Sequence, residues 1–245
     1  MSRSIRLSSI LFPAVWCLKK RFGKNDGRGE RGSMSEADML IFDLDGTLVD
    51  SREHITHAVN EMLRDLDLPQ RSFDEVVAVI GTGVRDLVYQ CAGQRKEVVD
   101  RGVELFTNHY RRNLEEMKVF SGVEDVLEHF REKVLLVTTN ARKEMAEAVL
   151  KAVHLDTYFL HIVGGDDDRC LKPDACPVDR ARELFRVPPS RAVFIGDMDV
   201  DILAGKRAGL ITCGVTYGVG DLQSLRKAGP DFLIDRIVEL KKIIR

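Results

Sequence analysis

The sequence predicts an α/β protein with a doubly wound, mainly parallel Rossmann-like sheet and an inserted helical cap domain. In the second half of the chain, short apolar strands alternate with helical patterns of roughly ten residues, which is typical of repeated βαβ units. Polar and acidic residues follow several of these strands. Because the carboxyl ends of parallel strands meet at one edge of a sheet, we expect the functional site at that edge.

The first predicted strand covers residues 39–44, where apolar residues dominate. Helical periodicity follows over residues 52–67, and Pro69 closes it. Further helices are predicted over residues 73–80, 85–92 and 96–117. A crossover between parallel strands needs far fewer residues than this strand-free stretch. We therefore expect residues 52–118 to form a helical cap.

After residue 119 the pattern becomes an alternation of strands and helices. Strands are predicted over residues 134–138, 159–163, 192–195 and 211–215. Helices are predicted over residues 123–130, 143–153, 176–185 and 201–208. Residues 35–51 and 119–245 are therefore expected to form the core domain.

The first 34 residues differ in composition from the rest. Residues 1–33 contain eight Lys or Arg and only two acidic residues. An apolar run over residues 10–18 is interrupted by Pro13, and no small-residue cleavage site follows it, which disfavours a signal peptide. A membrane-surface anchor is a second alternative. We expect a basic, disordered extension or a start assigned too early, because regular structure begins just after Met34.

The bulk composition limits the function classes. The formal net charge is −2, so the chain beyond its basic start is acidic, which argues against nucleic acid as a partner. No stretch approaches the ~20 apolar residues that span a bilayer. Five cysteines without a CxxC pair predict free thiols in a reducing, cytoplasmic compartment. We expect a monomer or a homodimer.

The most informative segment is an apolar strand that runs into two aspartates and a glycine. Residues 41–51 read IFDLDGTLVDS. Strands favour apolar and β-branched side chains, so Asp43 and Asp45 at the end of one need a counter-charge, which a divalent cation supplies. An Asx-type turn with Asp43 as a cap is the alternative for this segment taken alone.

Two later segments place a hydroxyl and an ammonium group near the same edge. Residues 134–140 read VLLVTTN, a strand that becomes polar only at its end. Taken alone, Thr139 is better explained as a cap for the helix predicted to start near Lys143. Lys172 precedes Pro173 in a loop, where it can neutralise negative charge, although Lys-Pro is common in loops.

A further strand ends in Gly-Asp, and another aspartate follows four residues later. Residues 193–201 read VFIGDMDVD. Acidic residues are favoured in the first turn of a helix, which explains Asp199 or Asp201 without any function. This preference does not explain Asp197, which lies at the end of a buried strand.

In this order, and each at the carboxyl end of a strand, the four segments resemble the motifs of the haloacid dehalogenase superfamily of phosphatases. The resemblance extends over about residues 38–240. It implies a Mg²⁺ cofactor held by Asp43, the backbone carbonyl of Asp45, and Asp197. Asp201, behind them, would orient water molecules or Lys172.

The resemblance also implies catalytic roles for Asp43, Asp45, Thr139 and Lys172. With a reference pKa near ~3.9, Asp43 is expected to be ionised and to attack phosphorus without a base. Asp45 would protonate the leaving alkoxide and then deprotonate a water molecule. Thr139, Lys172 and backbone amides near Asn140 would bind the phosphoryl oxygens. An aspartate at position 45 is typical of phosphatases and mutases, whereas dehalogenases lack it and membrane-pump ATPases carry threonine.

The predicted cap resembles the small helical cap of the phosphoglycolate phosphatase and phosphomutase branch. Residues 80–87 read IGTGVRDL and resemble its specificity loop, so substrate contacts are expected from Gly81, Gly83 and Arg85. Arg85 has the planar fork that pairs with a second anionic group, and a surface arginine is the alternative. The segment GVTYG at residues 214–218 favours the phosphoglycolate phosphatase branch. Gly196 stands where β-phosphoglucomutases typically carry glutamate.

These features predict a Mg²⁺-dependent phosphatase that acts on a small phosphorylated metabolite through an aspartyl-phosphate, with 2-phosphoglycolate as the first candidate. Sugar phosphates, nucleotides, pyrophosphate and a mutase reaction are alternatives. A catalytically idle member of the fold, acting as a binding or regulatory protein, is the alternative of another class. Such a protein should carry damage to at least one motif, and all four motifs are intact.

Overall fold

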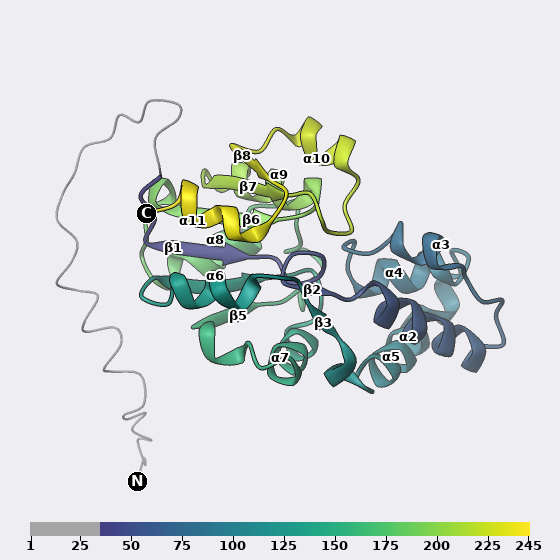
Figure 1. Cartoon of the computed structure of the whole chain (residues 1–245). Coiled ribbons are helices and arrows are strands. Elements are labelled where there is room, and N and C mark those ends of the chain that lie inside the picture. Colours follow the sequence, from purple (N-terminus) through teal and green to yellow (C-terminus); the bar gives the residue numbers. More distant parts are fainter. Residues whose placement is uncertain (1–34) are drawn as a thin grey trace, which may run out of the picture. The chain divides into compact units, whose positions relative to one another are not determined.

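The computed structural model describes residues 35–245, and Figure 1 shows their arrangement. The description below concerns the compact unit of residues 34–245. The expectation of a disordered extension over residues 1–34 lies outside the described residues.

A six-stranded sheet in the order β5-β4-β1-β6-β7-β8 forms the centre of the unit, and every neighbouring pair is parallel. Its strands are β1 (Met39–Phe42), β4 (Val134–Thr138), β5 (His161–Val163), β6 (Ala192–Gly196), β7 (Ile211–Val215) and β8 (Phe232–Ile234). β1 lies between β4 and β6, with Ile41 paired to Leu136 and Phe194. All four residues of β1 are buried because a central parallel strand is covered on both faces.

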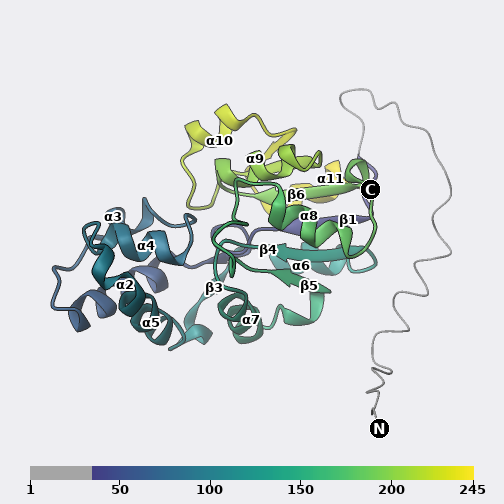
Figure 2. The ribbon, with the colours of Figure 1, turned by 180° about the vertical axis from the view of Figure 1, so that it is seen from behind.

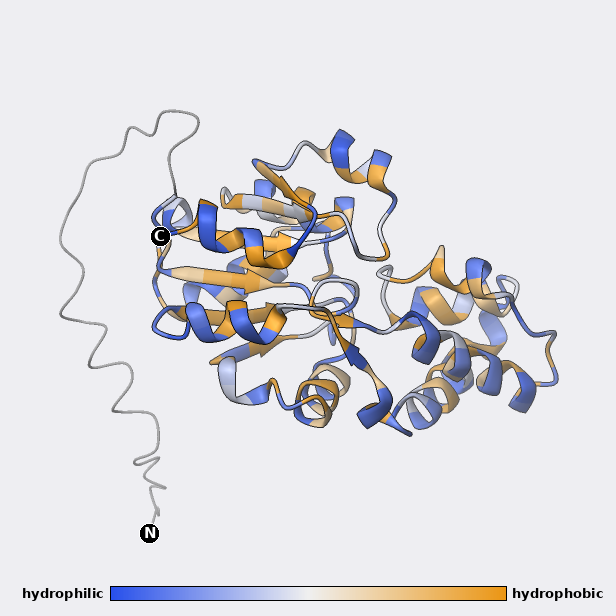
Figure 3. Cartoon of the chain, viewed as in Figure 1, coloured by the Kyte–Doolittle hydropathy of each residue, from blue (hydrophilic) through white to orange (hydrophobic). Residues whose placement is uncertain are grey.

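Helices cover both faces of this sheet, which confirms the predicted doubly wound fold. α8 and α9 lie on one face, and α6 and α11 pack together on the other (Figures 1 and 2). The helices after residue 119 are α6 (Val123–His129), α7 (Lys143–Ala152), α8 (Cys176–Glu183), α9 (Asp199–Arg207), α10 (Leu222–Ala228) and α11 (Leu240–Ile243). Figure 3 shows apolar strands between helices that carry both apolar and polar residues, as expected for a sheet buried between two layers.

Residues 52–110, which follow the turn after β1, contain four α-helices. These are α2 (Arg52–Asp65), α3 (Phe73–Val77), α4 (Val84–Cys91) and α5 (Val99–Tyr110). All four helices lie within residues 52–118, the predicted cap. The boundaries of the cap as a domain stay a prediction. α5 packs against both α2 and α4. Gly102 of α5 permits the close approach of α4, because a Cβ there would lie 2.6 Å from Cγ1 of Val88 in α4.

Several elements differ from the sequence-based prediction. The helix predicted over residues 96–117 ends at Tyr110, and Asn113 adopts a left-handed conformation with φ 56°. A two-stranded antiparallel ribbon of β2 (Val49–Asp50) and β3 (Lys118–Val119) was missed, as were α10, β8 and α11. The strands among them have two or three residues, too few to show an alternating pattern.

The prediction that all cysteines are free thiols is wrong. Cys170 and Cys176 form a disulfide, since the loop between them folds back and brings their Cα atoms to 5.4 Å, within the range that a disulfide requires. The argument from free thiols for a reducing compartment loses its basis. Cys91 and Cys213 are free and buried. Burial raises the pKa of Cys91 to about 11.

No helix among residues 35–245 is both long enough and apolar enough to cross a bilayer. Apolar side chains instead fill a continuous core between the sheet and its helices. Leu40 illustrates this core, because it lies on the central strand β1 with no exposed surface.

We expect Leu40→Ala to lower the free energy of unfolding by about 2–5 kcal/mol, because the lost burial adds to the cavity left behind. Urea unfolding followed by circular dichroism measures this change. Leu184→Ala is the matched control, since Leu184 is 61% exposed and its truncation should change stability by less than about 0.5 kcal/mol. Equal losses in the two variants would contradict this account of the core.

Candidate active site

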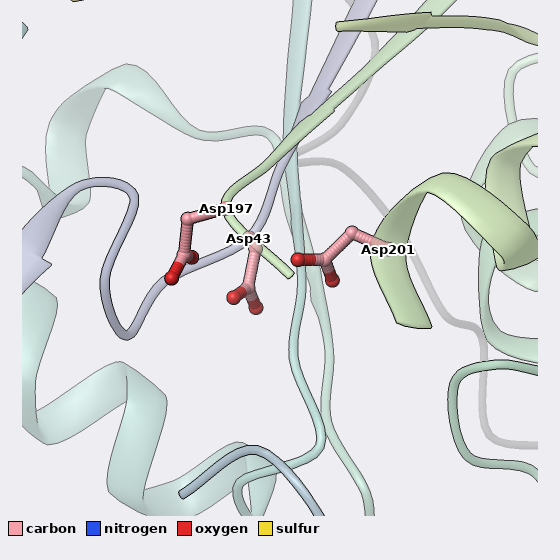
Figure 4. Close-up of side chains that lie close together, drawn as sticks. All are labelled: Asp43, Asp197 and Asp201. Carbon is pink, nitrogen blue, oxygen red and sulfur yellow. The ribbon is translucent and has the colours of Figure 1, made fainter. Parts of the chain in front are cut away.

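Three aspartates gather at the carboxyl edge of the sheet. Asp43 follows β1, Asp197 follows the neighbouring strand β6, and Asp201 lies in the first turn of α9. One carboxylate oxygen from each lies within 4.8 Å of the other two, and all three residues are buried. Figure 4 shows Asp43 between Asp197 and Asp201. The parallel pairing of β1 with β6 therefore brings together residues that are far apart in the sequence.

A single ammonium group enters this carboxylate cluster. Nζ of Lys172 lies 2.6 Å from Oδ1 of Asp43 and 2.7 Å from Oδ1 of Asp201. It also donates to the carbonyl of Thr138 at 3.2 Å. Burial lowers the pKa of Lys172, but Asp201 and Asp43 outweigh that effect and the net pKa is raised. Lys172 is therefore positively charged in this site.

Asp197 is held in place by three donors. The hydroxyl of Thr47 donates to its Oδ1 at 2.8 Å, and the amides of Val219 and Gly220 donate to its Oδ2 at 2.7 and 3.1 Å. Burial is the largest cause that raises the pKa of Asp197, to about 7, and repulsion from Asp201 adds to it. The hydrogen bonds oppose this rise only in part.

Burial also raises the pKa of Asp43 well above its usual range, although Lys172 opposes the rise. The ionised state of Asp43 stays a prediction, and its raised pKa means that nearby positive charge is needed to reach that state. When ionised, the three carboxylates carry more negative charge than the one ammonium group can neutralise. A divalent cation would neutralise the remaining charge and lower the pKa values of the carboxyl groups. Buried carboxylate oxygens are ligands that Mg²⁺ prefers, so the donor set fits this ion.

Asp45 lies in the turn after β1 and lines the same cavity as Asp43. Its Oδ1 is buried and has no hydrogen-bond partner among residues 35–245. Burial raises the pKa of Asp45, so this carboxyl group is protonated more readily than an exposed one. The Asx-turn alternative for Asp43 is not what the structure shows, because that side chain contacts Lys172.

Thr139 and Asn140 follow β4, the strand on the other side of β1. Oγ1 of Thr139 accepts from the amide of Ala141 at 3.1 Å, so the hydroxyl proton can face the cavity that Thr139 lines. Thr139 does not cap α7, whose N-cap is Arg142. The carboxamide of Asn140 contacts the backbone of Gly81 and Lys172.

Arg85 is not brought to this site. It pairs with Asp100 at 2.8 Å and lies 3.6 Å from Asp168, and it lines two other cavities. Gly81 and Gly83, by contrast, line the cavity that contains Asp43. The backbone of the loop before α4 reaches the site, and the arginine beside it does not.

The cavity over Asp43 is small, at about 50 Å³, and much of its wall is apolar. Sequence reasoning missed this wall, which consists of Ile55, Ile80, Val84, Leu87, Phe106, Tyr110, Met145, Met198 and Val200. Most of these residues fit the core stripes of helices, so periodicity gave them a structural explanation. Met198 and Val200, which lie between Asp197 and Asp201, could have been found from their place in the motif.

Comparisons with known proteins agree with this geometry. The model of the haloacid dehalogenase-like hydrolase family matches residues 40–215. The chain belongs to this family. It is 35% identical over 209 residues to the phosphoglycolate phosphatase of Aquifex aeolicus, covering 84% of this chain and 96% of that protein. It is 32% identical over 218 residues to the enzyme of the same name from Haemophilus influenzae, covering 84% and 97%.

Solved structures give the same result. The crystal structure of a predicted phosphoglycolate phosphatase from Haemophilus somnus matches with a TM-score of 0.78 and 28% identity, over 84% of this chain and 97% of that chain. The resemblance inferred from the four motifs is thereby confirmed, and the chain is a hydrolase of the phosphoglycolate phosphatase-like branch.

Gly46 provides a test of how tightly the turn after β1 packs against Asp197. Its φ is +90°, and a Cβ there would lie 2.3 Å from Oδ2 of Asp197. We expect Gly46→Ala to displace Asp197 and to lower phosphatase activity by at least about 10-fold. Phosphate release under saturating Mg²⁺ measures this loss.

Gly93→Ala is the matched control, because Gly93 also has a positive φ, +71°, but its nearest neighbour would be 3.5 Å away. It should cost about 1–2 kcal/mol of stability through backbone strain and leave activity unchanged. Equal activities of the two variants would show that contact with Asp197 is not what requires glycine at position 46.

Proposed function

We propose that this protein is a Mg²⁺-dependent phosphatase that hydrolyses a small phosphomonoester through an aspartyl-phosphate on Asp43. The contact of Asp43 with Lys172, beside two further buried aspartates, supports this proposal most directly. These neighbouring groups suit a nucleophilic carboxylate, a cation and a set of divalent-metal ligands that act together at the sheet edge.

In the first step an oxygen of Asp43 forms a bond to phosphorus while the bond from phosphorus to the leaving oxygen breaks. Lys172 and Thr139 stabilise the phosphoryl oxygens as charge moves between them. Asp45, whose pKa is raised by burial, donates its proton to the leaving alkoxide. The products of this step are the alcohol and the phosphorylated Asp43.

In the second step Asp45, now ionised, accepts a proton from a water molecule as that water attacks phosphorus. The bond between phosphorus and Asp43 breaks, which releases inorganic phosphate and restores both carboxyl groups. A single residue thus acts first as acid and then as base.

Mg²⁺ would be held by the side chains of Asp43 and Asp197 and by the backbone carbonyl of Asp45. When bound, it supplies positive charge that reduces repulsion between Asp43 and the phosphate dianion. Asp201 remains paired with Lys172 and accepts from the amide of Met198 at 2.9 Å, so it keeps the ammonium group in place.

2-Phosphoglycolate is the proposed substrate. The relatives from Aquifex aeolicus and Haemophilus influenzae carry the name phosphoglycolate phosphatase. The small cavity over Asp43 also favours a short leaving group over a sugar or a nucleoside. Because Arg85 is engaged by Asp100 and Asp168, we propose that the backbone at Gly81 and Gly83 contacts the leaving group instead.

Asp43→Asn tests the nucleophile. We expect turnover of p-nitrophenyl phosphate and 2-phosphoglycolate to fall by at least about 10³-fold, because an amide does not form the phosphorylated intermediate. Chelation of Mg²⁺ from the wild-type protein should abolish turnover reversibly. Phosphate release measures both effects.

The control for this variant is Asp125→Asn, which changes an exposed aspartate paired with Lys241 and should keep full activity. Activity that survives Asp43→Asn, or that needs no metal, would overturn the mechanism. A folded wild-type protein without turnover on any phosphomonoester of a metabolite panel would favour the catalytically idle alternative.

Asp45→Asn tests the proton transfers. We expect steady-state turnover to fall by about 10²–10⁴-fold because water is no longer deprotonated. p-Nitrophenolate leaves without a proton, so p-nitrophenyl phosphate should still give a rapid burst of nitrophenolate equal to the enzyme concentration. Stopped-flow absorbance measures the burst. Its absence, with equal losses on aryl and alkyl phosphates, would contradict the role of Asp45.

A further inference from the structure

Asn140 joins two loops that approach the active site from different parts of the chain. Its Nδ2 donates to the carbonyl of Gly81 at 2.8 Å and to the carbonyl of Lys172 at 3.0 Å. Its Oδ1 accepts from the amide of Lys172 at 2.8 Å. Gly81 lies between α3 and α4, and Lys172 lies between β5 and α8. One buried carboxamide therefore contacts both loops.

The chemistry of these contacts requires an amide. The amide of Lys172 can only donate, and the two carbonyls can only accept, so the orientation of the Asn140 carboxamide is determined by its partners. Both of its N–H groups are used in these bonds. The side chain is therefore not available to donate to a phosphoryl oxygen, and its effect on the reaction must pass through the loops that it holds.

On one side, Asn140 fixes the backbone of Lys172 through both its N–H and its C=O group. The ammonium group of the same residue contacts Asp43 and Asp201. A displacement of about 1 Å at a reacting centre can cost about 10²-fold in rate. The two backbone bonds thus help to set the position of the charge that faces the nucleophile.

On the other side, Asn140 fixes the loop that lies over the cavity. Gly81 and Gly83 line the cavity containing Asp43. A Cβ on Gly81 would lie 2.4 Å from Sδ of Met198, and one on Gly83 would lie 3.2 Å from Cδ1 of Leu171. The loop is therefore packed closely against the segments that carry Lys172 and Asp197.

Among residues 35–245, two exposed ion pairs also join the predicted cap to the segments after β4. Arg111 pairs with Glu144 at 2.7 Å, with side chains 46% and 52% exposed, and Arg85 lies 3.6 Å from Asp168. Exposed ion pairs are screened by salt and contribute little. The buried bond from Asn140 is better placed to hold the loop at the site.

We propose that Asn140 is a positioning residue that couples the placement of the Gly81 loop over the cavity to the placement of Lys172 against Asp43. This role rests on the proposed phosphatase function. When the loop is held, the backbone of Lys172 is held by the same carboxamide. The loop that contacts the leaving group and the lysine that contacts the phosphoryl group are thereby positioned together.

Kinetics of Asn140→Ala and Asn140→Asp test the proposal in the full chain with Mg²⁺ and 2-phosphoglycolate. Asn140→Asp keeps the size and the acceptor oxygen but loses both donors, and it serves if the alanine variant does not fold. We expect kcat to fall at least about 10-fold in both, with a smaller change in KM, because an interaction needed in the transition state is lost. Arg111→Ala, which removes an exposed pair at the same boundary, should keep the wild-type kcat.

A double-mutant cycle separates positioning from general damage. If Asn140 acts through Lys172, Asn140→Ala should lower kcat by less than about 3-fold in a Lys172→Ala background. Effects that multiply in full would overturn the proposal, and so would wild-type kcat in both Asn140 variants.

Hydrogen exchange provides a readout that does not depend on activity. In Asn140→Ala and Asn140→Asp, peptides covering residues 78–87 and 168–175 should both exchange faster than in the wild type, and neither should change in Arg111→Ala. A change confined to one of the two segments would overturn the coupling. Wild-type protein without phosphatase activity would overturn the proposed function alone, because the exchange measurement still tests whether Asn140 joins the loops.

Discussion

The ammonium group of Lys172, buried between Asp43 and Asp201, is the interaction on which the rest of the site depends. Burial disfavours the charged form of these carboxyl groups, and repulsion among the three aspartates adds to this effect, so the pKa values of Asp43 and Asp197 are raised. Removing the ammonium would leave buried charges unpaired, which proteins tolerate poorly. The surrounding structure must therefore deliver a lysine to this point.

The strand order of the parallel sheet brings the partners of this lysine to one edge. β1 lies between β4 and β6, so Asp43 has Thr139 on one side and Asp197 on the other. The lysine comes from a loop outside the sheet, and that loop is tied to the sheet edge by Asn140. Strand pairing positions Asp43 and Asp197, whereas side-chain hydrogen bonds from Asn140 position the backbone of Lys172.

Much of this arrangement could be predicted from the sequence. Buried strands with polar ends can be recognised in the sequence, and the pairing of parallel strands then brings Asp43 and Asp197 together at the carboxyl edge of the sheet. Contacts that depend on loop conformation cannot be recognised in this way, which is why Arg85 was expected at the site and the side-chain contacts of Asn140 with two loops were not foreseen. The Cys170–Cys176 pairing was missed for the same reason, because a spacing of six residues does not specify how a loop folds back.

The three donors to Asp197 have a consequence for metal binding. Thr47, Val219 and Gly220 fix this carboxylate from both of its oxygens, so its orientation does not depend on an ion. A pre-organised ligand loses little conformational entropy when it binds a cation. Occupancy of the site should then follow the free concentration of the metal, and loss of the metal should leave the fold intact.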